Sequence, residues 1–175
     1  GMDLAAGLHN RLNDVPELKI LADRLGRKLF DVRHPTQAFT VANGRKRAGK
    51  RLLPVGTDCS CGKMYTALAV EKEMLARGMK ATFRATGQTG ILISGAGVSI
   101  DAVVSDFVAG AVEVLAPAND ADHWDVIEGQ GSLFHPSFAG VTTGIIHGAQ
   151  ADALVLCHEP TRQAMRGVDY PIPDL

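Results

Sequence analysis

One run of residues constrains the fold more than any other. The apolar segment 52–55 leads into a loop bounded by Gly56 and Gly62, and Lys63 follows where a helix-forming sequence begins. In such a turn the backbone N–H groups point inward, the helix N-terminus is positive and the lysine adds a full charge. We therefore predict a cradle for a phosphorylated ligand. The residues expected to contact that ligand are Gly56, Thr57, Asp58, Cys59, Ser60, Cys61, Gly62, Lys63, Met64 and Tyr65.

The spacing of this run differs from that of the commonest phosphate-binding loop, which has four residues between its glycines and Ser or Thr after the lysine. Here five residues separate Gly56 from Gly62, and Met64 follows Lys63. A thioether is a poor ligand for Mg²⁺, which prefers oxygen. The usual hydroxyl contact to Mg²⁺ is therefore missing at this position, and a glycine-rich turn without a ligand is the alternative interpretation.

The composition narrows the class of protein. A length of 175 residues favours one domain with a sizeable core. A net charge of −1 and an aromatic content of 5% argue against nucleic-acid and anionic-membrane partners, and no apolar run reaches the roughly 18 residues of a membrane span. Three cysteines, two of them in the loop, indicate free thiols in a reducing cytoplasm.

Hydrophobic periodicity predicts alternating strands and helices along the chain. Strands are expected at 28–32, 52–56, 81–85, 124–128 and 153–157, and helices at 14–26, 63–77, from 99 or 101 to 115, and 138–148. This order implies an α/β fold, a parallel sheet with helices on both faces. The basic stretch 36–50 is either a solvated linker or a loop near the phosphate, and 158–175 shows no clear element.

A carboxylate stands at the end of one predicted buried strand. Glu128 is followed by Gly129-Gln130-Gly131, and glycines let a ligand approach closely. Glu128 is therefore a candidate base or Mg²⁺ ligand, with a carboxylate that only caps the next turn as the alternative. Asp58 lies inside the cradle, where phosphate would repel it unless Mg²⁺ or an ammonium group offsets its charge. It is a second candidate for metal binding or amine recognition.

Other side chains are candidates for substrate contact and proton transfer. Thr86, Gln88 and Thr89 follow the strand that ends near residue 85, and with Gln130 they offer hydroxyls and amides to a small polar substrate. Ordinary turn chemistry explains these residues equally well. His158 follows the last strand and is a candidate proton carrier, although a lone histidine is more often structural.

Two resemblances follow from these residues. Gly56-Thr57-Asp58 with Gly62-Lys63, and later Val126-Ile127-Glu128-Gly129, resemble dethiobiotin synthetase and its amidoligase relatives. That resemblance implies a P-loop NTPase-like domain of the dethiobiotin-synthetase type, which uses ATP and Mg²⁺ to activate a carboxyl group.

The second resemblance covers nearly the whole chain. The sequence resembles a bacterial and archaeal family, long catalogued as of unknown function, some of whose members act as D-glutamate N-acetyltransferases. The matching stretches are Gly7-Leu8-His9, Asp31-Val32-Arg33, Gly56-Thr57-Asp58-Cys59 with Gly62-Lys63, Arg84–Gly90, Asp101–Val104 with Asp106-Phe107, Glu128–Ser132 and Cys157–Pro160. It implies that 1–35 is a hinge or remnant of a preceding Rossmann-like domain, 36–50 a basic linker, and 51–175 a P-loop domain incomplete at its C-terminus.

Three functions are open at this point. The first moves acetyl from acetyl-CoA to the amine of an acidic amino acid such as D-glutamate, with Glu128 or His158 as base and Lys63 beside loop N–H groups as stabiliser. The second is an ATP-dependent ligase in which Asp58 and Glu128 share Mg²⁺. The third is a non-catalytic nucleotide-binding module. In each case the apolar helix that ends at Leu115 favours a homo-oligomer.

Overall fold

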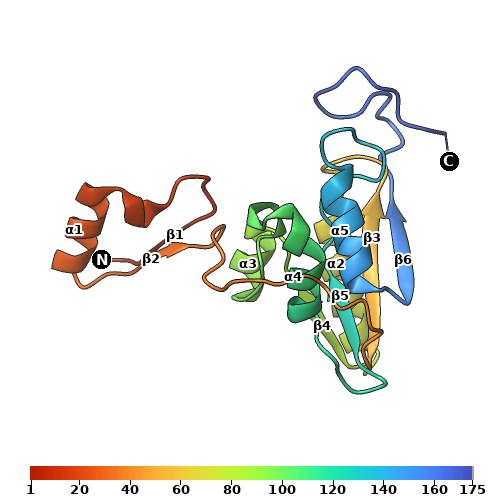
Figure 1. Cartoon of the computed structure of the whole chain (residues 1–175), viewed down its shortest axis with the longest axis horizontal. Helices are drawn as coiled ribbons and strands as arrows, with labels where there is room; N and C mark the ends of the chain where they lie inside the picture. The colour runs from red at the N-terminus through yellow and green to blue at the C-terminus, as the bar shows by residue number, and fades with distance from the viewer. Residues whose placement is uncertain (175) are drawn as a thin grey trace.

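A computed structural model describes residues 1–174, and it shows a small N-terminal lobe beside a larger α/β domain (Figure 1). The lobe is a β-α-β unit. Its two short strands, β1 (Leu4–Ala6) and β2 (Leu29–Asp31), pair in parallel, and helix α1 (Pro16–Arg24) connects them after a 3₁₀ turn, η1 (Leu12–Asp14). The sequence predicted α1 and β2, but β1 is too short to show a periodicity.

The α/β domain is built on four parallel strands in the spatial order β4-β5-β3-β6. The strands are β3 (Lys50–Gly56), β4 (Ala81–Arg84), β5 (Trp124–Ile127) and β6 (Ala153–Cys157). Because all four run the same way, their carboxyl ends meet at one edge of the sheet, where open α/β sheets bind ligands. The predicted fold class is confirmed.

Helices cover both faces of this sheet (Figure 1). On one face Leu52, Phe83 and Val126 pack with α2 (Lys63–Ala76). On the other face Leu53 and its neighbours pack with α4 (Val108–Leu115) and α5 (Ala139–Ala149). Successive residues of a strand point to opposite faces, so burial on both sides explains why β3 reads as an uninterrupted apolar run. Among residues 1–174, no helix combines the length and apolar character needed to cross a bilayer.

Two predicted elements near the middle of the chain were wrong. A helix, α3 (Gln88–Ser94), stands where a loop was expected. The expected long helix is instead two 3₁₀ turns, η2 (Ile100–Ala102) and η3 (Ser105–Phe107), followed by α4. Val103 and Val104 have extended backbones, which β-branched residues favour, and they interrupt the helix.

The shortened helix α4 also changes the argument for an oligomer. Val108, Gly110, Ala111 and Val112 are buried. Helix α5, the sheet and the linker cover these residues within one chain, and a Cβ added at Gly110 would lie 1.8 Å from the carbonyl oxygen of Thr40. The apolar surface on which the homo-oligomer expectation rested is thus largely satisfied internally.

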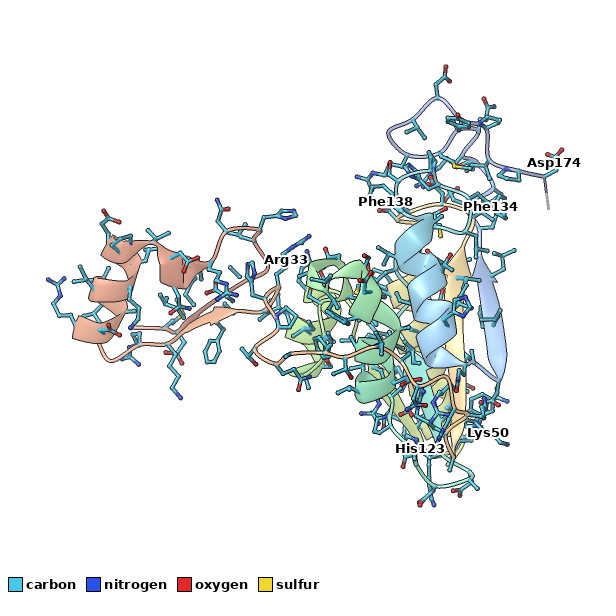
Figure 2. The ribbon with its side chains drawn as sticks, in the orientation of Figure 1. Arg33, Lys50, His123, Phe134, Phe138 and Asp174 are labelled. Carbon is cyan, nitrogen blue, oxygen red and sulfur yellow. The ribbon has the colours of Figure 1, made fainter. Side chains whose placement is uncertain are left out.

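The basic stretch 36–50 runs from the lobe along α4, where Thr40 lies beside Gly110, and ends at the amino edge of the sheet, opposite the phosphate loop (Figure 1). Figure 2 shows Lys50 and His123 at that end and Phe134 and Phe138 at the opposite one. Arg47 donates to the carbonyl oxygens of Ala116 and Gly148 at 2.8 Å, so its side chain fastens the segment to the ends of α4 and α5. Of the two interpretations from sequence, the loop near the phosphate is not what the structure shows; Arg45, Lys46 and Lys50 are exposed, as a solvated linker would have them, and Arg47 is the cation that packs.

Side chains near both ends of the lobe contact the α/β domain. Arg33, which Figure 2 places between them, forms an ion pair with Asp101 of η2. Gly7 faces the side chain of Gln88, and a Cβ added at Gly7 would come within 2.5 Å of the Gln88 Cγ atom. Both contacts fall near the carboxyl edge of the sheet, since Gln88 begins the helix that follows β4.

Candidate functional site

The loop between β3 and α2 has the geometry of a tight phosphate cradle. Gly62 has a φ of +100° and Ser60 a φ of +54°, both in the left-handed region that bends the chain sharply before Lys63 starts the helix. A Cβ added at Gly56 would lie 2.6 Å from the Sγ atom of Cys61 and 2.9 Å from the Nζ atom of Lys63. Only glycine therefore permits the loop to close around the lysine side chain.

This loop holds positive potential that the chain itself does not neutralise. Lys63 is 6% exposed, and its Nζ atom donates to the carbonyl oxygen of Asp58 at 3.0 Å. Within residues 1–174, no carboxylate pairs with Lys63, and no hydrogen bond takes up the backbone N–H groups of Ser60, Cys61, Gly62 or Lys63. A buried ammonium group and unpaired N–H groups at a helix N-terminus attract an anion such as phosphate.

Glu128 lies directly after β5 and is 3% exposed. Its Oε2 atom accepts from the N–H groups of Thr86 at 2.8 Å and Gly87 at 3.0 Å, while its Oε1 atom accepts no hydrogen bond from residues 1–174. Burial raises the pKa of Glu128 above its usual value, although the two N–H groups partly oppose the shift. A Cβ at Gly90 would stand 2.3 Å from Oε2, so this glycine makes room for the carboxylate.

The predicted substrate-binding residues separate into different roles. Thr86 is fully buried and its hydroxyl donates to the carbonyl oxygen of Glu128 at 2.7 Å, so it orients Glu128 and presents no surface to a substrate. Gln88 faces the N-terminal lobe, and Thr89 is exposed on α3. Of the four candidates, Gln130 lies on the large cavity described next.

A cavity of about 810 Å³ joins the phosphate loop to Glu128. It brings together residues from segments far apart in the sequence, and the predicted site residues on its wall include Lys63, Tyr65, Glu128 and Gln130. Apolar side chains add to the wall as well. The residues that sequence reasoning did not place here are Asp101, Phe138, Val141, Arg166 and Gly167.

Asp58 belongs to an ionic clasp and is not open to the cavity. Its Oδ2 atom accepts from the Nη1 atom of Arg162 at 2.6 Å and from the N–H group of Arg166 at 2.8 Å, and its Oδ1 atom accepts from the N–H group of Cys59 at 2.7 Å. Burial opposes ionisation, but these donors outweigh it and hold the pKa of Asp58 below its usual range. Asp58 thus fastens the C-terminal segment to the loop.

The residues present do not favour a protein-bound Mg²⁺ site. Both oxygens of Asp58 are occupied by protein donors. In the part of the chain that the structure describes, no three His, Cys, Asp or Glu side chains gather closely enough to hold a metal ion. The predicted pairing of Asp58 with Glu128 on Mg²⁺ would therefore require the clasp to open.

His158 and Cys59 occupy different places around the loop. The Nδ1 atom of His158 lies 3.1 Å from the Oγ1 atom of Thr57, which is fully buried, and His158 is not among the residues that form the cavity wall. Cys59 does reach the wall, but burial raises the pKa of its thiol. Of the candidate proton acceptors, Glu128 is the one that faces the cavity.

Sequence reasoning missed the two arginines of the clasp. Arg162 and Arg166 belong to a hairpin whose ends meet through a bridge between Ala164 and Pro171. Their position in the sequence was the one indication of a role, because both follow the carboxyl end of the last strand, at the edge of the sheet where the phosphate loop lies. The segment shows no periodicity, so nothing local indicated a fold.

Comparisons with known proteins agree with this geometry. The family model described as "Domain of unknown function (DUF1611_C) P-loop domain" matches residues 40–175 and thereby confirms the P-loop prediction. The model described as "Domain of unknown function (DUF1611_N) Rossmann-like domain" matches residues 1–35.

Individual relatives are similar over the whole chain. A protein of Tritonibacter scottomollicae named D-glutamate N-acetyltransferase is 64% identical over 100% of this chain and 53% of the relative. A Pseudoalteromonas protein of the same name is 55% identical over 96% of this chain and 51% of the relative. The crystal structure of a DUF1611 family protein from Anabaena variabilis aligns with a TM-score of 0.92 and 40% identity, over 99% of this chain and 51% of that one. The chain thus spans about half the length of these relatives.

Proposed function

This chain belongs to the DUF1611 family, and we propose that it transfers an acetyl group from acetyl-CoA to the amine of an acidic amino acid such as D-glutamate. One observation carries the proposal. On the same cavity wall lie a buried lysine and a buried carboxylate, and neither has a partner of opposite charge within residues 1–174. The lysine suits binding of an anionic acetyl donor, and the carboxylate suits removal of a proton from an ammonium group.

The phosphate loop would hold the donor. Acetyl-CoA carries a pyrophosphate, and the ammonium group of Lys63 with the unpaired N–H groups beside it matches such an anion. Binding of this kind needs no hydrolysis and no hydroxyl ligand for Mg²⁺, so Met64 after the lysine is acceptable here. Tyr65, Phe138 and Val141 line the same cavity and offer apolar surface to the rest of the donor.

Glu128 would act as the general base. Its Oε2 atom is held by two backbone N–H groups, which leaves Oε1 to take a proton from the substrate ammonium group. The freed amine forms a C–N bond to the thioester carbonyl carbon and the C–S bond breaks. Of the two protons that the nitrogen loses on becoming an amide N–H, one protonates the departing thiolate and the other is released to solvent. The raised pKa of Glu128 makes it a better base than an exposed carboxylate would be.

The competing ATP-dependent ligase is less well supported by these residues. It uses Asp58 as a partner of Glu128 on Mg²⁺, and Asp58 is committed to Arg162 and to two backbone N–H groups. Substrate-dependent release of ADP would identify that reaction.

The test is to incubate the chain with acetyl-CoA and D-glutamate in the presence of EDTA. Mass spectrometry would follow N-acetylglutamate, and a thiol reagent would follow free CoA. We expect both products in equal amounts from the wild type and a loss of both in Glu128→Gln. A wild-type chain that forms no N-acetylglutamate here, and that releases ADP in a parallel assay with ATP, Mg²⁺ and D-glutamate, would refute the proposal.

A further inference from the structure

We propose that Arg166 binds a carboxylate of the acidic amino acid and so selects the substrate. The inference rests on the proposed function, since it names the residue that recognises the acyl acceptor. Arg166 lies on the wall of the same cavity as Lys63 and Glu128, yet it comes from the C-terminal hairpin, a segment that neither the loop motif nor the strand pattern includes.

The backbone of Arg166 is fixed from both sides by buried side chains. Its N–H group donates to the Oδ2 atom of Asp58 at 2.8 Å, and its carbonyl oxygen lies 3.0 Å from the Nε2 atom of His135. Asp58 is fully buried and His135 is 2% exposed. The N–H group of Ser137 donates to the Nδ1 atom of His135, so Nε2 carries the proton and donates to Arg166. Two buried polar groups are therefore used to place one residue.

Within the described part of the chain, the guanidinium group of Arg166 keeps most of its donors free. Its Nη1 atom donates to the Oγ atom of Ser60 at 2.7 Å, and among residues 1–174 no carboxylate pairs with it. Arg162, four residues earlier on the same hairpin, differs in this respect, because Asp58 and the carbonyl oxygen of Cys59 both accept from its Nη1 atom. The hairpin thus carries one neutralised arginine that fastens it and one charged arginine that faces the cavity.

A carboxylate suits this position better than a phosphate. The loop N–H groups and Lys63 already supply a phosphate site, so the guanidinium fork of Arg166, which can hold two oxygens of a phosphate or of a carboxylate, is left for a second anion. Glu128 on the same wall is the partner for an ammonium group. A molecule that combines an amine with a carboxylate is complementary to both residues. Every amino acid meets this description, and the acidic amino acid of the proposed function offers two carboxylates to Arg166.

The test measures equilibrium binding by calorimetry, with no turnover required. The probes are D-glutamate, D-glutamine, which lacks the side-chain carboxylate, 4-aminobutyrate, which lacks the α-carboxylate, and CoA. In Arg166→Gln we expect the affinity for D-glutamate to fall about 10- to 100-fold. One of the two analogues lacks the carboxylate that Arg166 binds, and its affinity should change less than about twofold between the wild type and the variant. The affinity for CoA should change equally little.

Matched variants make the result specific. Arg166→Lys should recover part of the affinity, because a point charge replaces the fork. Arg24→Gln removes an exposed arginine on α1 and should change nothing. Thermal unfolding should show Arg166→Gln folded as the wild type, since Asp58 and His135 contact only backbone atoms of residue 166.

Two outcomes would overturn the inference. Loss of CoA affinity with unchanged D-glutamate affinity would assign Arg166 to the donor phosphates, and unchanged affinity for every probe would leave it an ordinary surface arginine. The inference and the proposed function can fail separately. If Arg166→Gln acetylates D-glutamate as well as the wild type does, only the inference is refuted. If the wild type binds D-glutamate through Arg166 and does not acetylate it, only the proposed function is refuted.

Discussion

The two edges of the parallel sheet both contain buried charge, and they use it in opposite ways. At the amino edge, Arg51 is fully buried and donates to the carbonyl oxygens of residues 47, 48, 49 and 117. Asp125 beside it pairs with Arg84 at 2.7 Å. At the carboxyl edge, Lys63 and Glu128 are buried without a partner of opposite charge within residues 1–174. Buried charge whose hydrogen bonds are mostly made by the chain, as at Arg51, fastens segments together, and buried charge with open donors or acceptors indicates where a ligand binds.

Two acidic residues of the β5 segment give the sharpest contrast. Asp125 lies within the strand and Glu128 follows it. We expect Glu128→Gln to lower kcat about 100- to 10,000-fold while stability is kept, because the base is lost and the shape is not. Asp125→Asn should instead cost about 3 kcal/mol of unfolding free energy and leave kcat of the folded protein unchanged, because it breaks a buried ion pair. Urea unfolding measures the stability of each variant, and initial rates measure kcat. A loss of stability in Glu128→Gln with a loss of kcat in Asp125→Asn would contradict the comparison.

The pH dependence of the reaction tests the same assignment. The pKa of Glu128 is raised by burial, and a base must be ionised, so kcat/KM should rise with pH through a midpoint above the ordinary glutamate value of 4.5. The rise should vanish in Glu128→Gln. A midpoint at or below 4.5 would assign the base elsewhere.

Two buried cations allow the comparison to be repeated for stability. Arg51→Met would remove the guanidinium donor from four carbonyl oxygens, of which that of Ala48 also accepts from the N–H group of Asn119, and we expect it to lower the unfolding free energy by about 3 kcal/mol. Lys63→Met removes a buried charge that no carboxylate of residues 1–174 offsets, so its effect should stay within about 1 kcal/mol. Lys72→Met on the exposed side of α2 is the control. Equal losses of unfolding free energy in Arg51→Met and Lys63→Met would show that the two edges of the sheet use buried charge in the same way.

Asp58 is the exception at the carboxyl edge, since it is buried and paired. Its folded-state pKa lies below the usual value of 3.8, so its contribution to stability is complete above that value and disappears as pH falls through the lower folded-state pKa. We expect Asp58→Asn to cost about 2 kcal/mol at pH 7, from weaker bonds to charged donors. Urea unfolding should show the difference from wild type shrinking in strong acid; a constant difference would mean that Asp58 is not ionised in the folded state.

The smallest expected effect concerns Cys59. It lies on the cavity wall, but burial raises the pKa of its thiol and so disfavours the reactive thiolate. Cys59→Ser should change kcat less than about threefold. A loss as large as that of Glu128→Gln, measured by the same assay, would instead indicate an acyl-carrying cysteine.

The sequence predicted the parts of the site that lie close together along the chain. The apolar strand, the glycine-bounded loop and Lys63 are consecutive, and Glu128 ends a recognisable strand. The clasp was not predictable, because Asp58 and Arg162 are 104 residues apart and no local pattern connects them. Helix α3 was missed because it is seven residues long, follows one glycine and contains another, Gly90, that makes space for Glu128.

The most direct measurement is a calorimetric titration of acetyl-CoA into the wild-type chain and into Lys63→Met, with EDTA present. Binding at one site to the wild type, weakened about 10- to 100-fold in the variant, is the expected result, because a charge-assisted contact to phosphate is lost. The same affinity in both proteins, or binding by neither, would contradict the claim that the unpaired lysine of the carboxyl edge holds the acetyl donor.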